Sequence, residues 1–386
     1  MSKPAEKKDL RFLVVDDQFN VRRMIQNFLR TFGYAKALEA SDGAKALETL
    51  RVHRVDLVIC DWNMPNMSGV ELLRVLRADR HLKDLPFLMV TAETGGDVVA
   101  EAIEEKVDGY IVKPFQARTL TDKIEAILEA RRTPDPVEKA LEQGYHHLSL
   151  GRSEQAMLFF EQAQELAPSS PRVLLALGQA LEVRQDDAAA LEHYQQAVAG
   201  SKRFVKGHDR LAALYEKMGR AQKALEHLKR AVKISPRNAA RQLSLGRLLI
   251  RQGRLDEGRA ALERAMAIDP GNAELAQQAG EIMLAAGLND PAAEAFHAAV
   301  ALDPAMVHVF NRMGLAYRRQ GLFQKAMEEY ARALDLVRDD ENLYYNLARA
   351  QEAAGLHREA LESLKEALRL KPDFERARQL HQRIKA

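Results

Sequence analysis

An alanine that recurs every 34 residues limits what the second half of this chain can fold into. The seven copies keep this spacing without exception: Ala163, Ala197, Ala231, Ala265, Ala299, Ala333 and Ala367. A fixed period between about 20 and 50 residues is the signature of a repeat architecture. Seven units of 34 residues fit residues 137–374 with no insertion.

Three further columns describe the unit. A small residue recurs at Gly144, Gly178, Ala212, Gly246, Gly280, Gly314 and Ala348. A glycine suited to a helix end recurs at Gly151, Gly219, Gly253, Gly287, Gly321 and Gly355, with Gln185 as the exception. A proline recurs at Pro168, Pro236, Pro270, Pro304 and Pro372. This pattern predicts two helices joined by a tight turn. One such unit cannot bury its apolar face alone, so the units must stack into an all-α solenoid.

The pattern resembles the tetratricopeptide repeat (TPR) family over residues 137–374. The resemblance implies a solenoid of seven repeats whose concave face usually holds a peptide or another protein. Residues 375–386 are more polar and suit a C-terminal capping helix.

The first 130 residues have a different texture, in which short apolar runs alternate with amphipathic segments. The runs are 12–15, 57–60, 87–90 and 110–112, with a weaker one at 35–38. The amphipathic segments are 21–32, 43–50, 70–78, 97–105 and 118–130. Five strands that alternate with five helices predict a doubly wound parallel α/β sheet. We expect this domain to cover residues 10–130, and a short linker with two prolines to cover 131–136.

Polar side chains follow the predicted strands at their ends. Asp16 and Asp17 follow the first strand, Asp61 the third, Thr91 the fourth and Lys113 the fifth. The carboxyl ends of parallel strands meet at one edge of a sheet, where ligands bind. Singly, each aspartate suits a helix cap or a turn equally well. Together they predict a site in which the carboxylates hold Mg²⁺ and one of them attacks a phosphoryl group.

The same region resembles the CheY-like response-regulator receiver domain, which has a flavodoxin-like fold. The resemblance runs over residues 10–128 and rests on four stretches: 12–17, 61–67, 88–93 and 112–115.

This resemblance implies a role for each residue of the site. Asp61 would accept a phosphoryl group from a sensor histidine kinase. Asp16, Asp17 and Asp61 would hold Mg²⁺, together with the backbone carbonyl of Asn63. Lys113 would pair with the phosphoryl group.

Two further pairs of residues take roles from the resemblance. Thr91 and Tyr110 would form the switch, although Tyr110 also suits a half-buried core position. Asn63 and Glu93 would tune the rate at which water removes the phosphoryl group.

The repeats offer two candidate binding surfaces on their first helices. One is apolar and comprises Leu141, Tyr145, Leu148, Leu175, Val183, Leu243 and Ile250. These side chains either line a groove or pack against neighbouring elements. The other is basic and rich in amides, and comprises Asn311, Arg312, Arg318, Tyr345, Asn346 and Arg349. It could hold the carboxylates of a peptide, although solvated charges would give the same pattern.

Composition excludes several classes of protein. The single cysteine, Cys60, excludes a disulfide framework within the chain. No apolar run approaches the roughly 20 residues that span a bilayer, so we expect no membrane insertion. The 57 Lys and Arg nearly balance 55 Asp and Glu, so nucleic acid is not an expected partner. The first ten residues lack the apolar core of a secretory signal, and we expect a cytoplasmic protein.

The most economical interpretation is a signalling protein rather than a metabolic enzyme. Mg²⁺-dependent phosphorylation of Asp61 would control protein–protein interactions of the repeats, and the resemblance suggests chemotaxis or motility as the pathway. Self-phosphotransfer and autodephosphorylation would be its only reactions. One alternative is a constitutive TPR scaffold whose receiver is a phosphate sink or a docking domain. Another is a phosphatase or transferase related by fold, against which the lack of a second catalytic constellation counts.

Overall fold

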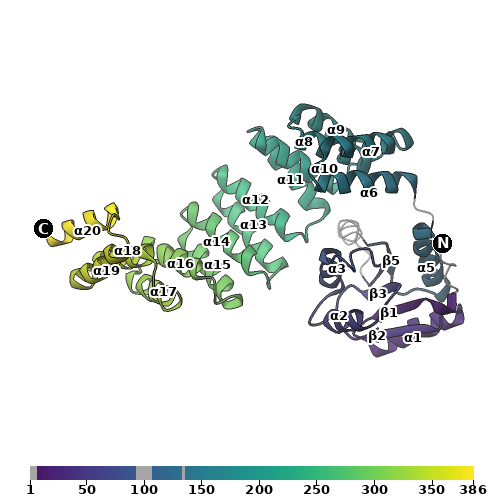
Figure 1. The fold of residues 1–386 in the computed structure, drawn as a ribbon, viewed down its shortest axis with the longest axis horizontal. Coiled ribbons are helices and arrows are strands. Elements are labelled where there is room, and N and C mark those ends of the chain that lie inside the picture. The colour runs from purple at the N-terminus through teal and green to yellow at the C-terminus, as the bar shows by residue number, and fades with distance from the viewer. Residues whose placement is uncertain (1–6, 93–106, 133–134) are drawn as a thin grey trace. The chain divides into compact units, whose positions relative to one another are not determined.

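The computed structural model describes residues 7–92, 107–132 and 135–386 (Figure 1). The chain divides into two compact units. The first unit consists of Met1–Met218 with Lys233–Pro236, and the second of Gly219–Val232 with Arg237–Ala386. This division falls inside the repeats, and the domain boundaries given above stay predictions. The expected helix at 97–105 lies outside the described residues.

A parallel five-stranded sheet forms the N-terminal part of the first unit. Its strands are β1 (Arg11–Val15), β2 (Lys36–Ala40), β3 (Leu57–Asp61), β4 (Phe87–Thr91) and β5 (Gly109–Val112). Their order across the sheet is β2-β1-β3-β4-β5, and every neighbouring pair is parallel. This is the doubly wound sheet that the alternating pattern predicted, with the flavodoxin-like fold that the resemblance implied. The weak run at 35–38 forms part of β2.

Helices cover both faces of the sheet (Figure 1). They are α1 (Phe19–Thr31), α2 (Gly43–Val52), α3 (Gly69–Ala78) and α5 (Ala117–Arg132), and a short 3₁₀ turn, η1 (Lys7–Asp9), precedes β1. Successive residues of a strand point to opposite faces. Phe12 and Val14 therefore pack with α1 and α5, whereas Leu13 and Val15 pack with α2 and α3. Both faces are apolar, which is why the strands have continuous apolar runs.

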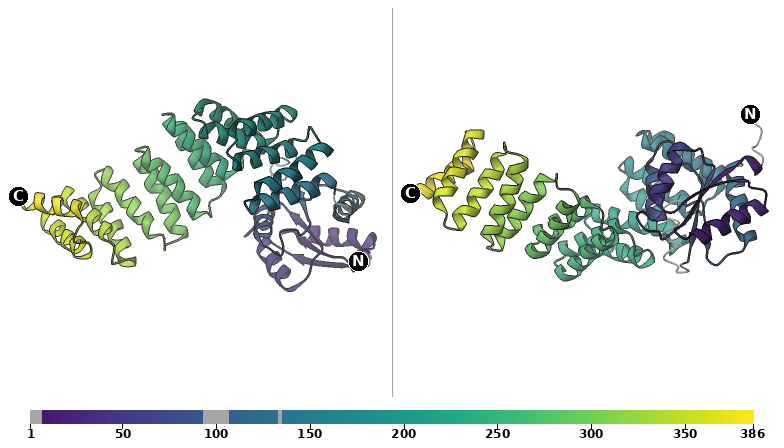
Figure 2. Two further views of the ribbon diagram at one scale, coloured as in Figure 1. Left: turned by 45° about the horizontal axis from the view of Figure 1, so that its top comes forward. Right: turned by 90° about the horizontal axis from the view of Figure 1, so that it is seen from below.

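Residues 136–374 contain two helices per repeat in chain order, and one helix follows them. The first helices of the repeats are α6 (Pro136–Ser149), α8 (Pro171–Val183), α10 (Val205–Lys217), α12 (Ala239–Arg251), α14 (Ala273–Ala285), α16 (Val307–Arg319) and α18 (Glu341–Ala353). The second helices are α7 (Ser153–Leu166), α9 (Asp187–Gly200), α11 (Ala221–Ile234), α13 (Leu255–Ile268), α15 (Asn289–Leu302), α17 (Phe323–Leu336) and α19 (His357–Leu370). The capping helix α20 (Glu375–Lys385) packs on α19. Within each unit, consecutive pairs follow one another in chain order, as Figure 2 shows from two further directions.

The columns of the repeat have the structural roles that their spacing predicted. All seven periodic alanines are fully buried. The six periodic glycines have φ angles between +72° and +80°, the left-handed region that favours glycine after a helix. Gln185 has a φ of +63°, so the one exception in sequence has the same backbone conformation.

In four repeats the glycine of the small-residue column makes room for an aromatic ring, whereas Gly246 faces Leu262. A Cβ atom at Gly280 would lie 2.6 Å from the ring of Phe296, and one at Gly314 would lie 2.6 Å from that of Tyr330. In the last repeat Ala348 takes the column, and a leucine, Leu364, stands where the ring would be. The missing Cβ therefore sets the distance between the two helices of a pair.

No helix in the described ranges is both long enough and apolar enough to cross a bilayer.

We predict that Gly280→Ala destabilises the repeats by about 1–3 kcal/mol, because the new methyl group overlaps a buried ring. Gly271→Ala is the control, since a Cβ there meets nothing within 4 Å and its φ is not left-handed. Urea unfolding followed by circular dichroism gives the difference.

The double variant Gly280→Ala/Phe296→Leu recreates the Ala348–Leu364 pair of the last repeat. We expect it to lose less stability than the two single changes added together, with a coupling of about 1 kcal/mol. Strict additivity would contradict the proposed contact.

Candidate functional site

The predicted polar side chains gather where the strand order reverses. The chain leaves β1 toward β2 on one side and β3 toward β4 on the other, so a crevice forms between β1 and β3. Val15 of β1 pairs with Cys60 of β3, which brings Asp16 beside Asp61 at the same edge.

The ammonium group of Lys113 joins these two carboxylates. Its Nζ donates to Asp16 Oδ2 at 2.8 Å and to Asp61 Oδ1 at 2.6 Å. Asp16 is 1% exposed and Asp61 is 8% exposed, so both charges are nearly removed from water. The backbone amide of Gln18 donates to Asp16 Oδ1 at 2.9 Å and fixes the other oxygen of that carboxylate. The three side chains thus form one ionic cluster at the end of the sheet.

The cluster changes the acidity of its members. Burial raises the pKa of Asp61, and the negative charges of Asp16 and Asp17 raise it further, while Lys113 opposes them. Burial lowers the pKa of Lys113, but the hydrogen bonds and charges of Asp16 and Asp61 outweigh it, so the net shift is upward. Lys113 therefore favours its charged form, whereas the neighbouring Asp61 ionises less readily than an exposed aspartate.

The remaining predicted residues surround this cluster. Asp17 and Asn63 are exposed at the rim. Thr91 is buried at the end of β4, and its carbonyl accepts the backbone amide of Lys113 at 2.7 Å. Tyr110 is half-buried and packs against the core on the α2 and α3 side. Glu93 lies outside the described residues.

Gly69, which sequence reasoning missed, supports the backbone of Asp61. A Cβ atom at Gly69 would lie 2.1 Å from the carbonyl oxygen of Asp61, so only glycine allows α3 to start this close. Its amide donates to the carbonyl of Trp62 at 3.0 Å. Ser68 and Glu71 form a capping box that fixes the start of α3. The spacing Ser-x-x-Glu is a sequence signal for such a cap.

Arg22 is a second residue that sequence reasoning missed. From α1 its Nη1 donates to the carbonyl oxygens of Asp16 at 2.8 Å and Asp17 at 3.3 Å. Its Nε donates to Glu39 Oε2 at 3.0 Å. The guanidinium therefore binds the backbone of the turn that carries Asp16 and Asp17, and not the side-chain carboxylates of these two residues.

The donor set suits a hard cation. Carboxylate and carbonyl oxygens are the ligands that Mg²⁺ prefers, and Asp16, Asp17, Asp61 and Asn63 supply only oxygen. Within the described ranges no three His, Cys, Asp or Glu side chains are already gathered as a metal cluster, and Lys113 lies between two of the carboxylates. The negative charges of Asp16 and Asp17 raise the pKa of Asp61, so a further cation here would relieve an existing repulsion.

The candidate surfaces of the repeats have different outcomes. Leu141 and Leu175 are buried. Leu148, Leu243 and Ile250 pack partly buried against the core, whereas Tyr145 is 38% and Val183 53% exposed. The structure favours the packing alternative for the buried members of the apolar set.

Five residues of the basic set line one groove: Asn311, Arg312, Tyr345, Asn346 and Arg349. Arg318 does not line it.

Family models match both parts of the chain. The response regulator receiver domain matches residues 12–125. Tetratricopeptide repeat models match residues 141–203, 215–267, 249–308, 314–355 and 341–374.

Known proteins are similar to one part or the other. The chemotaxis protein CheY of Pseudomonas aeruginosa is 49% identical over 120 residues, which are 31% of this chain and 97% of that protein. The chemotaxis protein CheY-3 of Vibrio cholerae is 47% identical over 122 residues, 32% of this chain and 94% of that protein. A crystal structure of a tetratricopeptide repeat protein from Parabacteroides merdae has 17% identity and a TM-score of 0.42, and covers 65% of this chain and 99% of its own.

The raised pKa of Asp61 gives a pH-dependent prediction. The folded state holds this proton more tightly than the unfolded chain, so ionisation of Asp61 costs stability above the raised pKa. We expect Asp61→Asn to raise the urea midpoint at pH 7, and the gain to shrink as the pH falls to about 4. The pKa of Lys113 is also raised, so it stays charged over this range.

Trp62 is the only tryptophan of the chain, is buried next to Asp61, and reports this transition by fluorescence. A gain that does not change with pH, or a loss of stability at pH 7, would contradict the electrostatic account.

We also expect Gly69→Ala to cost about 1–3 kcal/mol in the same assay, because the Asp61 carbonyl must move to admit a methyl group. A variant that unfolds at the wild-type urea concentration would show that the helix start tolerates a side chain.

Proposed function

Because the chain belongs to the response regulators, with a CheY-type receiver domain followed by tetratricopeptide repeats, we propose that phosphorylation of Asp61 controls what the repeats bind. A receiver joined to a repeat array is an architecture of signalling proteins. The observation that carries the proposal is the cluster of Asp16, Asp61 and Lys113 at the switch point of the sheet.

The chemistry follows from the position of Asp61. An oxygen of its carboxylate attacks the phosphorus of a phosphohistidine on a sensor histidine kinase, the P–N bond breaks, and the histidine leaves with the electron pair. The product is an acyl phosphate on Asp61. No general base is needed because the carboxylate is already ionised. Lys113, 2.6 Å from Asp61 Oδ1, is placed to pair with a phosphoryl oxygen as charge builds up on it.

Asp16, Asp17 and Asp61, with the backbone carbonyl of Asn63, would hold Mg²⁺, which when bound neutralises part of the phosphoryl charge. The oxygen-only donor set and the repulsion that raises the pKa of Asp61 support this assignment. Asn63, exposed beside Asp61, and Glu93 would set how fast water reaches the acyl phosphate.

Thr91 and Tyr110 are the proposed switch. Thr91 is buried, and its carbonyl holds the amide of Lys113, so a shift of Lys113 toward a phosphoryl group acts on the end of β4. Tyr110 lies on the adjacent strand β5, where it pairs with Met89. Its side chain is half-buried and packs against the core, so a change at this site would alter its exposure. A local charge event would thus alter the surface near β5.

The similar CheY proteins are named for chemotaxis, and we propose motility signalling in the cytoplasm as the pathway. The alternative is a constitutive scaffold whose receiver is a phosphate sink or a docking domain. One observation favours it: the residues that line the groove of Asn311 and Asn346 all belong to the second unit, so the receiver contributes none of its walls.

We predict that acetyl phosphate with Mg²⁺ places one phosphoryl group on each chain, and that Asp61→Asn takes up none. Intact mass measured at low temperature gives the stoichiometry, and Trp62 fluorescence gives the rate. EDTA should abolish the reaction. Lys113→Ala should slow it by about 100-fold, in line with the loss of one fixed charge-stabilising donor.

Arg118→Ala is the control, because that side chain is 85% exposed and pairs only loosely with Asp122. Phosphorylation of Asp61→Asn, or turnover of many acetyl phosphate molecules with no labelled Asp61, would contradict the proposal.

A further inference from the structure

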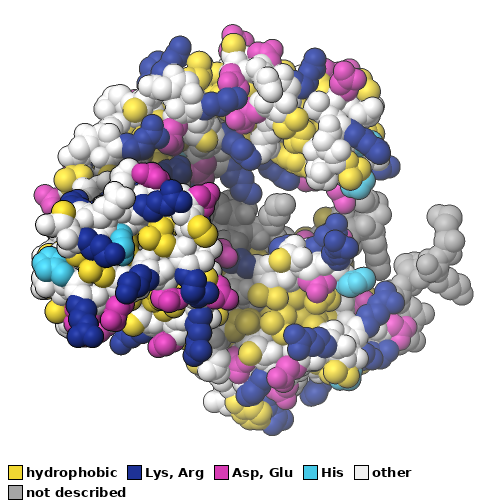
Figure 3. Space-filling view, turned by 60° about the vertical axis from the view of Figure 1, so that its left-hand side comes forward, with side chains coloured by type: hydrophobic (Ala, Val, Ile, Leu, Met, Phe, Trp, Pro, Cys, Tyr) yellow, Lys and Arg dark blue, Asp and Glu magenta, His cyan; other side chains and the backbone are white. Residues whose placement is uncertain are grey.

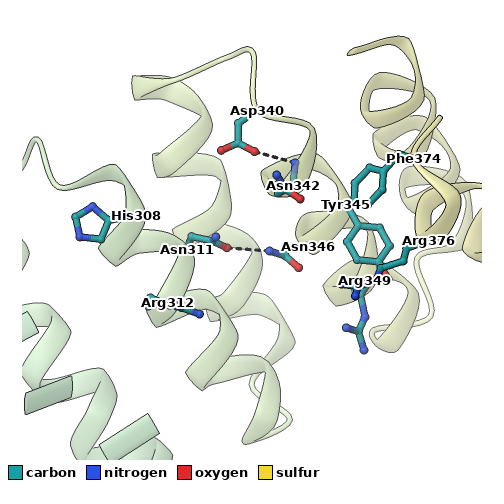
Figure 4. Close-up of a pocket in the computed structure, with 10 residues that line it drawn as sticks. All are labelled: His308, Asn311, Arg312, Asp340, Asn342, Tyr345, Asn346, Arg349, Phe374 and Arg376. Carbon is teal, nitrogen blue, oxygen red and sulfur yellow. Dashed lines mark hydrogen bonds between the residues drawn. The ribbon is translucent and has the colours of Figure 1, made fainter. Parts of the chain in front are cut away.

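A polar groove of about 610 Å³ lies between the first helices of the last two repeats and the capping helix (Figure 4). Its walls come from α16, α18 and the start of α20, all within the second unit. Figure 4 shows Asn311 and Asn346 between the aromatic pair Tyr345 and Phe374 on one side and His308 on the other. Three kinds of group therefore face one space: amides, aromatic rings and cations.

The two amides form a matched pair. Asn346 Nδ2 donates to Asn311 Oδ1 at 2.9 Å, which links α18 to α16. This bond leaves the Nδ2 of Asn311 as a donor and the Oδ1 of Asn346 as an acceptor for a ligand. A peptide backbone offers one C=O acceptor and one N–H donor per residue, so an extended segment complements the pair.

The rings form an apolar wall beside the amides. The centroids of Tyr345 and Phe374 are 5.1 Å apart, and both side chains are partly buried. The guanidinium of Arg349 lies 5.9 Å from the centroid of Tyr345, which fixes it against the ring face. Stacking of this kind holds the planar group in place before a ligand arrives.

The charges of the groove do not balance. Over the face of the molecule drawn in Figure 3, Lys and Arg lie interspersed with Asp and Glu. Arg312 of the groove also has an acidic partner, since its Nε lies 2.8 Å from Glu281 Oε1. Among the described residues, by contrast, Arg349 and Arg376 have no ion-pair partner, although both line the groove.

Asp340 is the acidic side chain that lines the groove, and it is hydrogen-bonded to the backbone at the start of α18. Its Oδ1 accepts the backbone amides of Asn342 at 2.8 Å and Leu343 at 3.2 Å, as the N-cap of α18. The groove therefore presents two uncompensated guanidinium groups.

We propose that this groove binds an extended acidic segment of a partner protein. Arg349 and Arg376 hold its carboxylates, Asn311 and Asn346 hold its backbone, and Tyr345 with Phe374 contacts its apolar atoms. The carboxylate comes from Asp or Glu side chains or from the end of the partner chain. The inference rests on the proposed function only in that the repeats bind a protein, and it does not require phosphorylation of Asp61.

Two peptide display libraries test it on the full-length protein. Each carries nine random residues, in one case flanked on both sides and in the other ending in a free carboxylate. If side chains supply the carboxylate, we expect selected peptides from both libraries to share an acidic residue at a fixed position. If the chain end supplies it, we expect peptides from the second library alone, with shared residues at a fixed distance from the free carboxylate. No selected peptides, or peptides without this carboxylate, would overturn the proposal.

The double variant Arg349→Gln/Arg376→Gln should bind a selected peptide at least about tenfold more weakly by fluorescence anisotropy, because it loses two charge-assisted contacts. Arg358→Gln is the matched control, since that arginine of α19 is 91% exposed and lies outside the groove. Equal binding by wild type and double variant would overturn the proposal. So would a phosphoserine version of the peptide that binds while the Asp or Glu version does not.

Asp61→Asn separates this inference from the proposed function. It should bind the peptide as the unphosphorylated wild type does, since no receiver residue lines the groove. The double variant should still be phosphorylated at Asp61. Circular dichroism verifies the fold of each variant, and both mutated arginines are exposed.

Discussion

The N-terminal site depends on one ammonium group shared by two nearly buried carboxylates. Asp16 and Asp61 follow adjacent strands, and burial makes their mutual repulsion strong. Lys113 reaches them from the end of β5 and donates a hydrogen bond to each, at 2.8 Å to Asp16 and 2.6 Å to Asp61. The compensation is incomplete, because the pKa of Asp61 stays raised. A further positive charge would therefore stabilise the Asp61 carboxylate, and the Lys113 ammonium already lies beside it. Phosphoryl transfer needs both features.

The repeats depend on a different constraint, the absence of a Cβ where two helices meet. Glycine faces Phe296 and Tyr330, and in the last repeat alanine shares a cluster with leucine. In these repeats the small residue fixes the spacing of the two helices, and the 34-residue period repeats the small residue along the chain. The same period sets successive first helices next to one another, and Asn346, one position past the equivalent of Asn311, donates a hydrogen bond to it across that contact.

Much of this could be predicted from sequence because it follows from period and topology. Strand ends of a parallel sheet must meet, so Asp16, Asp61 and Lys113 could be grouped before any coordinates were known. A periodic glycine after a helix requires a positive φ, and even Gln185 obeys it. Contacts between loops could not be predicted. Gly69 touches the Asp61 carbonyl through a turn whose path no pattern specifies. The apolar column was ambiguous for a related reason, since a leucine suits a groove or a helix contact equally well, and Leu141 and Leu175 turn out to be buried.

The central claim is that the phosphoryl group on Asp61 changes what the repeats bind. The most direct test is capture of partners from cell extract on the immobilised full-length protein. Mg²⁺ alone is compared with Mg²⁺ plus beryllofluoride, which mimics the phosphoryl group, and Asp61→Asn serves as the control. The account predicts a partner whose binding changes with beryllofluoride only when Asp61 is intact. A partner bound equally under all three conditions would contradict it and identify the protein as a constitutive scaffold.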